Sequence, residues 1–139
     1  MLQRLTPEGV AAPAANYSHA TLVPPNATWL YVSGQLGVRP DGSIPDDTQG
    51  QTEQIFENLG RVLASAGMTM ADVVRLNAFL VDPRDLATYM KVRDSYVAQP
   101  PPASTLVVVR ALARPVFRVE VEAVAAADRT HREGAVAVA

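Results

Sequence analysis

The sequence predicts a single domain of the α+β class, in which one β-sheet carries two helices on one face in the order β-β-α-β-α-β-β. Its 139 residues suit one domain. In two stretches of the chain, apolar residues recur at helical spacing. Runs rich in β-branched side chains, which are typical of strands, lie before, between and after these two stretches. The last run alternates between apolar and other side chains, which is typical of a strand that packs one face on a core.

The first elements should be a loop and two strands. Prolines and a glycine interrupt residues 1–16, where no period is sustained, so we expect a lead-in loop. A short strand is expected at 18–23. A second strand is expected at 29–34, which is rich in aromatic and β-branched side chains. Residues 37–46 contain an Asp-Gly turn and should form a loop.

A helix should follow this loop. Apolar side chains recur at i, i+4, i+7 and i+8, namely Ile55, Leu59, Val62 and Leu63. The polar side chains expected on the other side are Gln51, Glu53, Glu57 and Arg61. Gly67 lies where a C-terminal glycine cap should lie. Gly60 falls inside the helix, where glycine costs up to about 1 kcal/mol relative to alanine, and close packing of the helix on the sheet is its preferred explanation.

The second half should add a strand, a helix and two more strands. The apolar run 73–81 predicts a strand covered on both faces. Residues 84–97 predict a second amphipathic helix, which the prolines at 100–102 terminate. The final strands are expected at 104–109 and 116–125.

The composition limits the class of protein. Hydrophobic residues make up 48% of the chain, charged residues 19%, and the net charge is −2, so a largely disordered chain and a basic nucleic-acid-binding surface are both excluded. No run of about 18 apolar residues suggests a membrane span. The surface is short of charge for a small monomer, since soluble proteins average about 25% charged residues. The domain should span residues 1–126, and the small and polar side chains of 127–139 predict a disordered tail.

Cysteine and histidine usage narrows the chemistry further. There is no cysteine, which removes thiol nucleophiles, disulfides and thiolate metal ligands. The two histidines are His19 and His131, and zinc sites need three or four protein ligands, so no metal site is expected. His131 falls in the tail and should be solvated. The first residues have no apolar segment of secretory type, and we expect a cytoplasmic protein.

Two glutamates of the last strand, Glu120 and Glu122, should share a face because they are two residues apart. On a solvent-exposed face they would be ordinary surface charges. In a closed apolar pocket, burial would raise the pKa of one of them, and that group could move protons or activate water. Both interpretations are open at this point.

Two further segments carry polar groups. Tyr17, Ser18 and His19 precede a strand, and a hydrogen-bonded loop histidine is favoured over a catalytic base, because no orienting carboxylate or nucleophile elbow is visible. Ser33 and Gly34 close a strand, where glycine lets a small ligand approach main-chain groups. No phosphate-binding glycine pattern occurs, so a nucleotide is not implied.

Several of these pieces, read together and in order, resemble one family. Near the start of the chain, its motifs are similar to Tyr17-Ser18-His19-Ala20 and Val32-Ser33-Gly34-Gln35. In the middle, they are similar to the helix from Gln51-Thr52 to Asn58-Leu59 with Ala66-Gly67, and to the strand from Asp72 to Asp82. Near the end, they are similar to Pro102-Ala103 and to the closing run Val119 to Ala125. No single motif is specific, but the ordered set resembles the RidA (YjgF) family of reactive intermediate deaminases over roughly residues 10–126.

This resemblance implies a chorismate-mutase-like α+β fold assembled as a homotrimer, with small-molecule sites in clefts between subunits. It also implies hydrolysis of enamines and imines to a 2-keto acid and ammonia, with no metal or organic cofactor. By position, the family's pocket tyrosine corresponds to Tyr17 and its strand-end serine to Ser33, with Gly34 beside it. Its water-positioning glutamate corresponds to Glu120.

The chain departs from the family at the arginine that clamps the substrate carboxylate. Ser104 takes the place of this arginine, and Thr105 that of the following serine. A neutral hydroxyl donor is worth about 1 kcal/mol net, far less than a bidentate ion pair. We therefore expect a substrate that is not a simple 2-imino acid but is neutral or larger. The alternative is a non-catalytic trimer that binds a small metabolite or a protein partner. Three arginines could replace the clamp but are expected to be solvated or at an interface: Arg93, Arg110 and Arg118.

Overall fold

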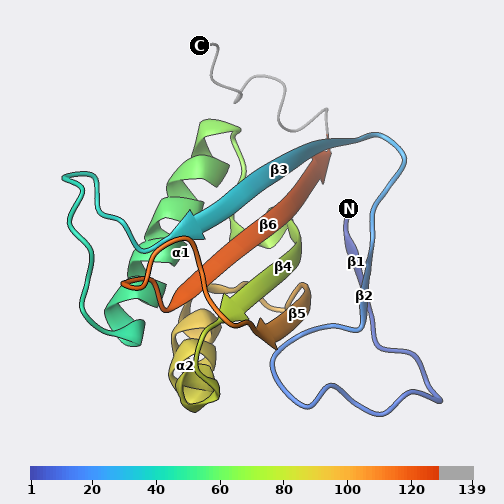
Figure 1. The fold of residues 1–139 in the computed structure, drawn as a ribbon. Helices are drawn as coiled ribbons and strands as arrows, with labels where there is room; N and C mark the ends of the chain where they lie inside the picture. Colours follow the sequence, from blue (N-terminus) through green and yellow to red (C-terminus); the bar gives the residue numbers. More distant parts are fainter. Residues whose placement is uncertain (129–139) are drawn as a thin grey trace.

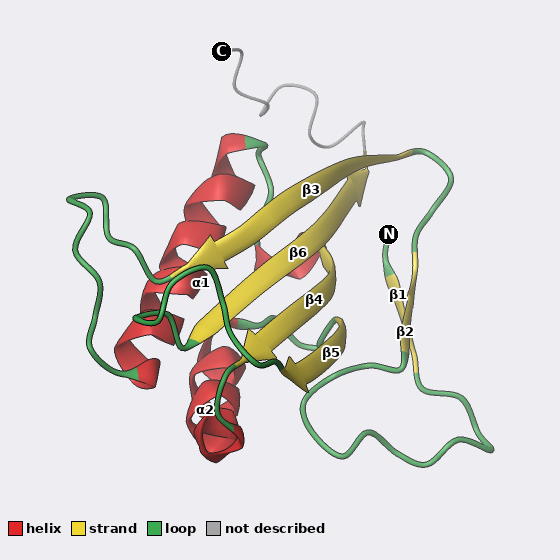
Figure 2. Ribbon diagram, in the orientation of Figure 1, coloured by secondary structure: helices red, strands yellow, loops and turns green. Residues whose placement is uncertain are grey.

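The computed structural model describes residues 1–128 and confirms the predicted α+β fold. Two helices cover one face of a four-stranded sheet, and the opposite face carries no helix (Figures 1 and 2). The predicted single sheet is wrong in one respect, because two short strands form a separate antiparallel ribbon beside it. Residues 129–139, which hold most of the predicted tail, lie outside the described part of the chain.

The elements follow the predicted order, with one additional strand at the start. They are β1 (Gln3–Leu5), β2 (Ala20–Leu22), β3 (Ala27–Leu36), α1 (Thr48–Ser65), β4 (Val73–Leu80), α2 (Leu86–Tyr96), β5 (Ala103–Val108) and β6 (Val119–Asp128). Short 3-10 turns precede β4 and α2, at Met70–Asp72 and Pro83–Asp85. β6 runs past the predicted end of its strand and into the first residues of the predicted tail.

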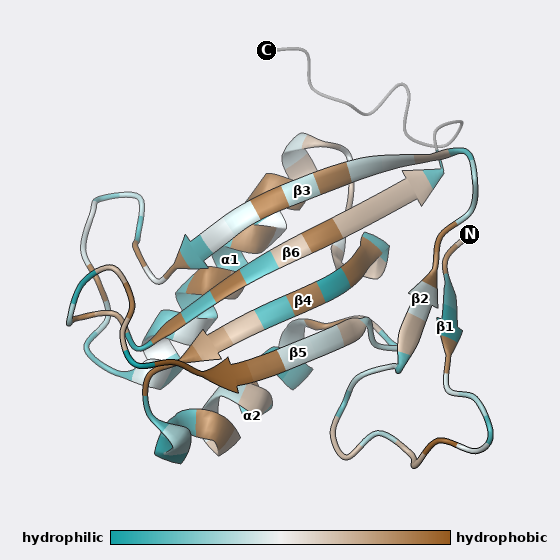
Figure 3. Ribbon diagram, turned by 45° about the vertical axis from the view of Figure 1, so that its right-hand side comes forward, coloured by the Kyte–Doolittle hydropathy of each residue, from teal (hydrophilic) through white to brown (hydrophobic). Residues whose placement is uncertain are grey.

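The sheet has the strand order β3-β6-β4-β5. β6 pairs antiparallel with both β3 and β4, whereas β4 and β5 are parallel neighbours joined through α2. The alternation predicted for β6 is confirmed, since Val119, Val121 and Ala123 are at most 3% exposed and point toward the helices. The intervening side chains of β6 point to the opposite, helix-free face, which we call the open face. Figure 3 shows the matching alternation of hydropathy along the strands as brown and teal bands.

The core lies between the sheet and the helices. α1 contributes Ile55, Phe56, Leu59 and Leu63, all at most 1% exposed, which confirms its predicted apolar stripe. α2 contributes Tyr89, whose ring lies 6.4 Å from that of Phe56. The predicted cap is confirmed as well, because Gly67 has a φ of +69° and its N–H donates to the Ala64 carbonyl. No helix within residues 1–128 has the length and apolar content needed to cross a membrane.

The start of the chain differs from the prediction of a plain loop. Gln3–Leu5 pairs with β2, and Arg4 donates from Nη1 to Thr21 Oγ1 at 2.9 Å. Sequence periodicity misses a strand of three residues, because its partner lies more than 15 residues away and sets the pairing. The segment predicted at 18–23 is correspondingly split, since Ser18 bridges to Ala103 at the edge of β5 before the chain turns away into β2.

Gln51 is fully buried, although the helical pattern predicts it on the solvent side. Its Nε2 donates to the carbonyls of Pro45 and Val116 at 3.0 and 2.9 Å, and its Oε1 accepts from the N–H of Arg118 at 2.9 Å. A buried amide with all these partners ties the start of α1 to the segment that leads into β6.

The strand predicted to be covered on both faces is covered on one. Leu76, Ala78 and Leu80 are at most 1% exposed, whereas Arg75 and Phe79 on the open face are only half-buried. The polar side chains of β4 fall at every second position, as expected for a strand whose sheet packs only one face against the core.

Gly60 does not have the role predicted for it. No atom lies within 4 Å of the position where a Cβ would stand, so the helix does not need glycine for close packing on the sheet.

We therefore expect Gly60→Ala to stabilise the protein by about 0.5–1 kcal/mol, because alanine loses less backbone entropy on entering a helix. Urea unfolding followed by circular dichroism would measure the shift in the midpoint. A destabilised variant would show that the position is crowded after all.

Candidate functional site

The carboxylate of Glu120 lies directly on the main chain of Gly34. A Cβ built at Gly34 would come within 2.9 Å of Glu120 Cδ and closer still to Oε2. The pairing of β3 with β6 slips between Val32 and Gln35, and Gly34 sits in this irregular stretch. Glycine is required here by close approach rather than by backbone angle, so the structure brings three predicted site residues together: Ser33, Gly34 and Glu120.

Glu120 is half-buried, and its carboxylate leans over the main chain of β3. Within residues 1–128, its carboxylate has no hydrogen-bond or ion-pair partner, whereas the neighbouring Glu122 accepts from Asn77 Nδ2 at 3.3 Å. The two glutamates share the open face, as predicted. In a single chain this face is not a closed apolar pocket, so the surroundings of Glu120 combine partial burial with unused hydrogen-bond acceptors.

Ser104 and Thr105 lie on opposite faces of β5. Ser104 pairs with Leu76 and stands two residues from Leu106, which packs against the core, so Ser104 points to the helix side. Thr105 pairs with Asn77 on the open face, where its hydroxyl accepts a hydrogen bond from Arg75. Of these two residues, only Thr105 shares the face of Glu120.

Tyr17 lies at the far edge of the sheet. The next residue, Ser18, donates from its N–H to the Pro102 carbonyl and from Oγ to the Pro101 carbonyl, at 3.0 and 2.6 Å, which fixes the loop beside β5. His19 packs edge-on against the Tyr17 ring with centroids 5.9 Å apart, and its Nε2 lies 2.6 Å from the Ala11 carbonyl oxygen. These contacts agree with a hydrogen-bonded loop histidine.

Tyr17 and Gly34 therefore stand at opposite edges of one sheet. β6, β4 and β5 lie between β3 and the Ser18 bridge, and neighbouring strands are about 4.8 Å apart, so the two edges are separated by roughly 19 Å. One chain alone does not unite Tyr17 with Glu120 in a single pocket.

The arginines are placed differently from one another. Arg93 is only 3% exposed, so its predicted solvation is wrong. Its Nε donates to Asp94 Oδ1 at 3.1 Å, and its guanidinium lies 5.9 Å from the centroid of the Tyr89 ring. Burial of that tyrosine raises the pKa of its hydroxyl. Arg118 lies 3.9 Å from Asp85, and Arg110 is exposed in the loop after β5.

Arg75 is the site candidate that the sequence analysis missed. It is the one basic residue in the four strands of the main sheet, and it lies on the open face with Glu120 and Glu122. The signal was present as the spacing of Arg75, Asn77 and Phe79 at every second position, but the apolar character of the run obscured it.

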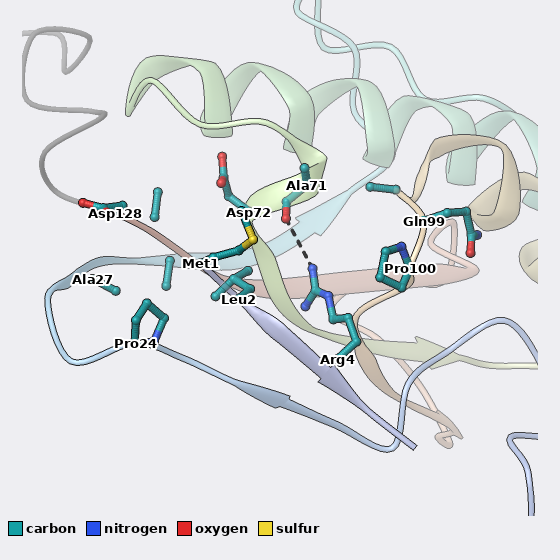
Figure 4. A pocket seen from close by; sticks show the side chains of 13 residues that line it. Met1, Leu2, Arg4, Pro24, Ala27, Ala71, Asp72, Gln99, Pro100 and Asp128 are labelled. Carbon is teal, nitrogen blue, oxygen red and sulfur yellow. Dashed lines mark hydrogen bonds between the residues drawn. The ribbon is translucent and has the colours of Figure 1, made fainter. Parts of the chain in front are cut away.

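A cavity of about 340 Å³ lies elsewhere, between the β1–β2 ribbon and the far end of β6 (Figure 4). Its walls are mostly apolar, and Arg4 donates from Nη2 to the Ala71 carbonyl at 3.3 Å at its side. Burial lowers the pKa of the Arg4 guanidinium. None of the predicted site residues lines this cavity. Across the described residues, no three histidine, aspartate or glutamate side chains gather as a metal site.

Comparison with known proteins bears on these observations. Residues 9–127 match the family model described as Endoribonuclease L-PSP. Protein HMF1 of Saccharomyces cerevisiae is 37% identical over 134 residues, which cover 91% of this chain and 98% of that protein. A 2-iminobutanoate/2-iminopropanoate deaminase of Rattus norvegicus is 35% identical over 118 residues, 82% of this chain and 83% of that enzyme.

Solved structures agree with the fold. YyfB of Yersinia pestis, described as a protein of unknown function of the conserved Rid family, superposes with a TM-score of 0.78 at 31% identity, covering 91% of this chain and 98% of its own. RidA of an Antarctic Psychrobacter gives a TM-score of 0.67 at 33% identity, with 88% and 98% covered. With its family model matched over most of its length and its fold shared with these proteins, the chain belongs to the RidA (YjgF) family, the Endoribonuclease L-PSP family of the matching model.

Proposed function

We propose that the protein is a cofactor-free hydrolase of a small imine, enamine or related C–N compound, in which Glu120 directs the attacking water. The observation that carries this proposal is the position of the Glu120 carboxylate, held against the Gly34 main chain with unused acceptor atoms among the described residues. A relative of this chain is named as an imine deaminase, which favours the same chemistry.

The proposed reaction adds water across the C=N bond and then releases ammonia. Glu120 accepts a proton as the water oxygen bonds to the imine carbon, which yields a carbinolamine. Glu120 returns this proton to the nitrogen, the C–N bond breaks with its electron pair leaving on nitrogen as ammonia, and the hydroxyl proton passes to Glu120 as C=O forms. An enamine enters the same sequence after protonation at carbon. In this scheme Ser33 and the Gly34 main chain help to hold the reacting group.

We propose that the working unit is a homotrimer whose sites lie between subunits. Tyr17 lies beyond β5 and the Glu120 carboxylate lies against Gly34 on β3, about 19 Å away across one sheet, so a pocket that contains both needs a second copy. The open face also exposes Tyr31 at 76% and Trp29 at 47%, stacked with centroids 6.3 Å apart, which is typical of a surface that a partner covers. Thr105 would line the same interface from the edge strand β5, whereas Ser104 points to the helix side and would lie outside it.

The substrate of this proposal is neutral or larger than a simple 2-imino acid, because Ser104 offers no positive charge. The competing function is a trimer that binds a small metabolite or a protein partner without catalysis. The two differ in one measurable respect, which is ammonia release from imines.

Glu120→Gln tests the catalytic role directly. We expect ammonia release from imines generated by an amino-acid oxidase to fall about 10²- to 10⁴-fold, because the amide keeps the shape of the side chain but cannot take the proton. The half-buried position should leave the unfolding midpoint unchanged. Wild-type protein that does not accelerate hydrolysis of any imine, including ones without a carboxylate, would favour the binding function instead.

Gly34→Ala tests the support of the carboxylate. The added methyl group would meet the flexible end of Glu120, so we expect the carboxylate to be displaced and turnover to drop at least tenfold, with little change in stability. Gly60→Ala is the matched control, because it introduces the same methyl group where nothing lies within 4 Å. Equal activity of the two variants would argue against the close contact of Gly34 with Glu120.

Mixing inactive subunits tests whether the site is shared. Tyr17→Ala and Glu120→Gln chains, denatured and refolded together in equal amounts, should recover about a quarter of wild-type activity, because each residue comes from an intact chain in half of the interfaces. Refolding each variant alone supplies the baseline. No recovery in the mixture, or a monomeric mass in solution, would contradict a site built from two copies.

A further inference from the structure

The open face carries a single positive charge, and its position is fixed by a hydrogen bond. Arg75 lies on β4, and its guanidinium donates to the hydroxyl of Thr105 on β5. The arginine side chain therefore extends over β5, past the row in which Asn77 pairs with Thr105. It makes no ion pair with any described residue.

The two glutamates of this face lie on the other side of β4. Glu122 is opposite Asn77 and accepts its amide hydrogen, and Glu120 is opposite Phe79, one pair further along. The Arg75 guanidinium lies over β5, whereas the Glu120 carboxylate lies against Gly34 of β3, so about three strand spacings, or roughly 14 Å, separate the two charged groups. Half-buried Phe79 lies between β5 and Glu120 and offers an apolar surface.

This charge pattern orients any ligand that spans it. An anionic group is attracted to the Arg75 end and repelled by the two carboxylates, whereas a protonated C=N group is attracted to Glu120. A carboxylate directly attached to the reacting carbon is poorly placed for both ends, since a substrate held by Arg75 in this way brings its C=N group near Asn77 and Glu122. An extended spacer of about four methylene groups lets one ligand, together with its attacking water, reach from Arg75 to Glu120.

The geometry points to Arg75 as a specificity-determining residue that binds an anionic group remote from the C=N carbon, so that the preferred substrates are imines with a distal carboxylate. Thr105 orients the guanidinium, and Phe79 supports the carbon spacer. This inference rests on the proposed function, since Glu120 must act at the other end of the ligand.

A pair of substrates of similar size tests the assignment. An L-amino-acid oxidase converts 2-aminopimelate and 2-aminoheptanoate to imines of equal chain length that differ only in whether the side chain ends in a carboxylate. For wild-type protein we expect kcat/KM for ammonia release to be at least tenfold higher with the 2-aminopimelate-derived imine. The ratio of the two values does not depend on how much of a preparation is folded.

Arg75→Met should remove this preference and lower the ratio at least tenfold, chiefly through a lower kcat/KM for the 2-aminopimelate-derived imine. Arg75→Lys should retain part of the ratio, because it keeps the charge but loses the two-pronged geometry. Thr105→Val should lower the ratio less than Arg75→Met. Arg110→Met is the matched control, since it removes an exposed arginine from the loop after β5 and should leave the ratio unchanged.

The outcomes separate the two proposals. A wild-type protein with no preference for the distal carboxylate, or an Arg75→Met variant that keeps the preference, would overturn the assignment of Arg75 alone. Loss of the preference in Arg110→Met instead would show that the loop arginine binds the distal carboxylate, and it would equally overturn the assignment of Arg75. Failure to hydrolyse either imine while imines without a carboxylate are hydrolysed would overturn the assignment of Arg75 alone, and failure with every imine would overturn the proposed function as well.

Discussion

The alternation of side chains along β6 is the constraint on which both the fold and the candidate site depend. β6 is an inner strand, bonded to β3 on one side and β4 on the other. Val119 and Val121 enter the core beneath the helices, and Glu120 and Glu122 must then face away from it. A slip of one residue would bury both carboxylates and expose the valines, at a cost of several kcal/mol. The apolar side chains of β6 therefore fix the position of the carboxylate that lies between them.

Local sequence patterns correctly predicted the main helices, the central strands and the shared face of the two glutamates. They did not predict why a glycine stands at each position. Gly60 lies inside a predicted helix and Gly34 closes a predicted strand, and at neither position does the sequence show why a glycine stands there. Their difference lies in what stands beside them: open space for Gly60, and the side chain of a residue 86 positions away in the sequence for Gly34. Such a contact exists only once β3 and β6 have paired, so no local pattern can reveal it.

Local patterns also failed to predict the environment of polar residues that lie within apolar segments. Gln51 was assigned to the solvent side, yet it is buried with three main-chain partners that come from segments before and after it in the sequence. Arg75 was hidden in a run interpreted as apolar on both faces. In both cases the hydrophobic pattern predicts the element correctly and misplaces the side chain, because the partners that stabilise a buried or half-buried polar group are set by tertiary structure.

Under the proposed function, the charges of the open face explain why an imine is a suitable substrate for this fold. Around the candidate site the charges of this face are Glu120, Glu122 and Arg75, with Asp128 at the far end of β6, and covering the site with a second copy would remove water from the first three. Glu122 keeps the amide of Asn77 and Arg75 keeps the hydroxyl of Thr105, but Glu120 has no partner within residues 1–128. An unpaired carboxylate in a dry interface is costly and seeks a positive charge. A protonated imine supplies that charge in the ground state and loses it as water adds, so the same electrostatic demand that draws the substrate to Glu120 is relieved by proton transfer to the carboxylate.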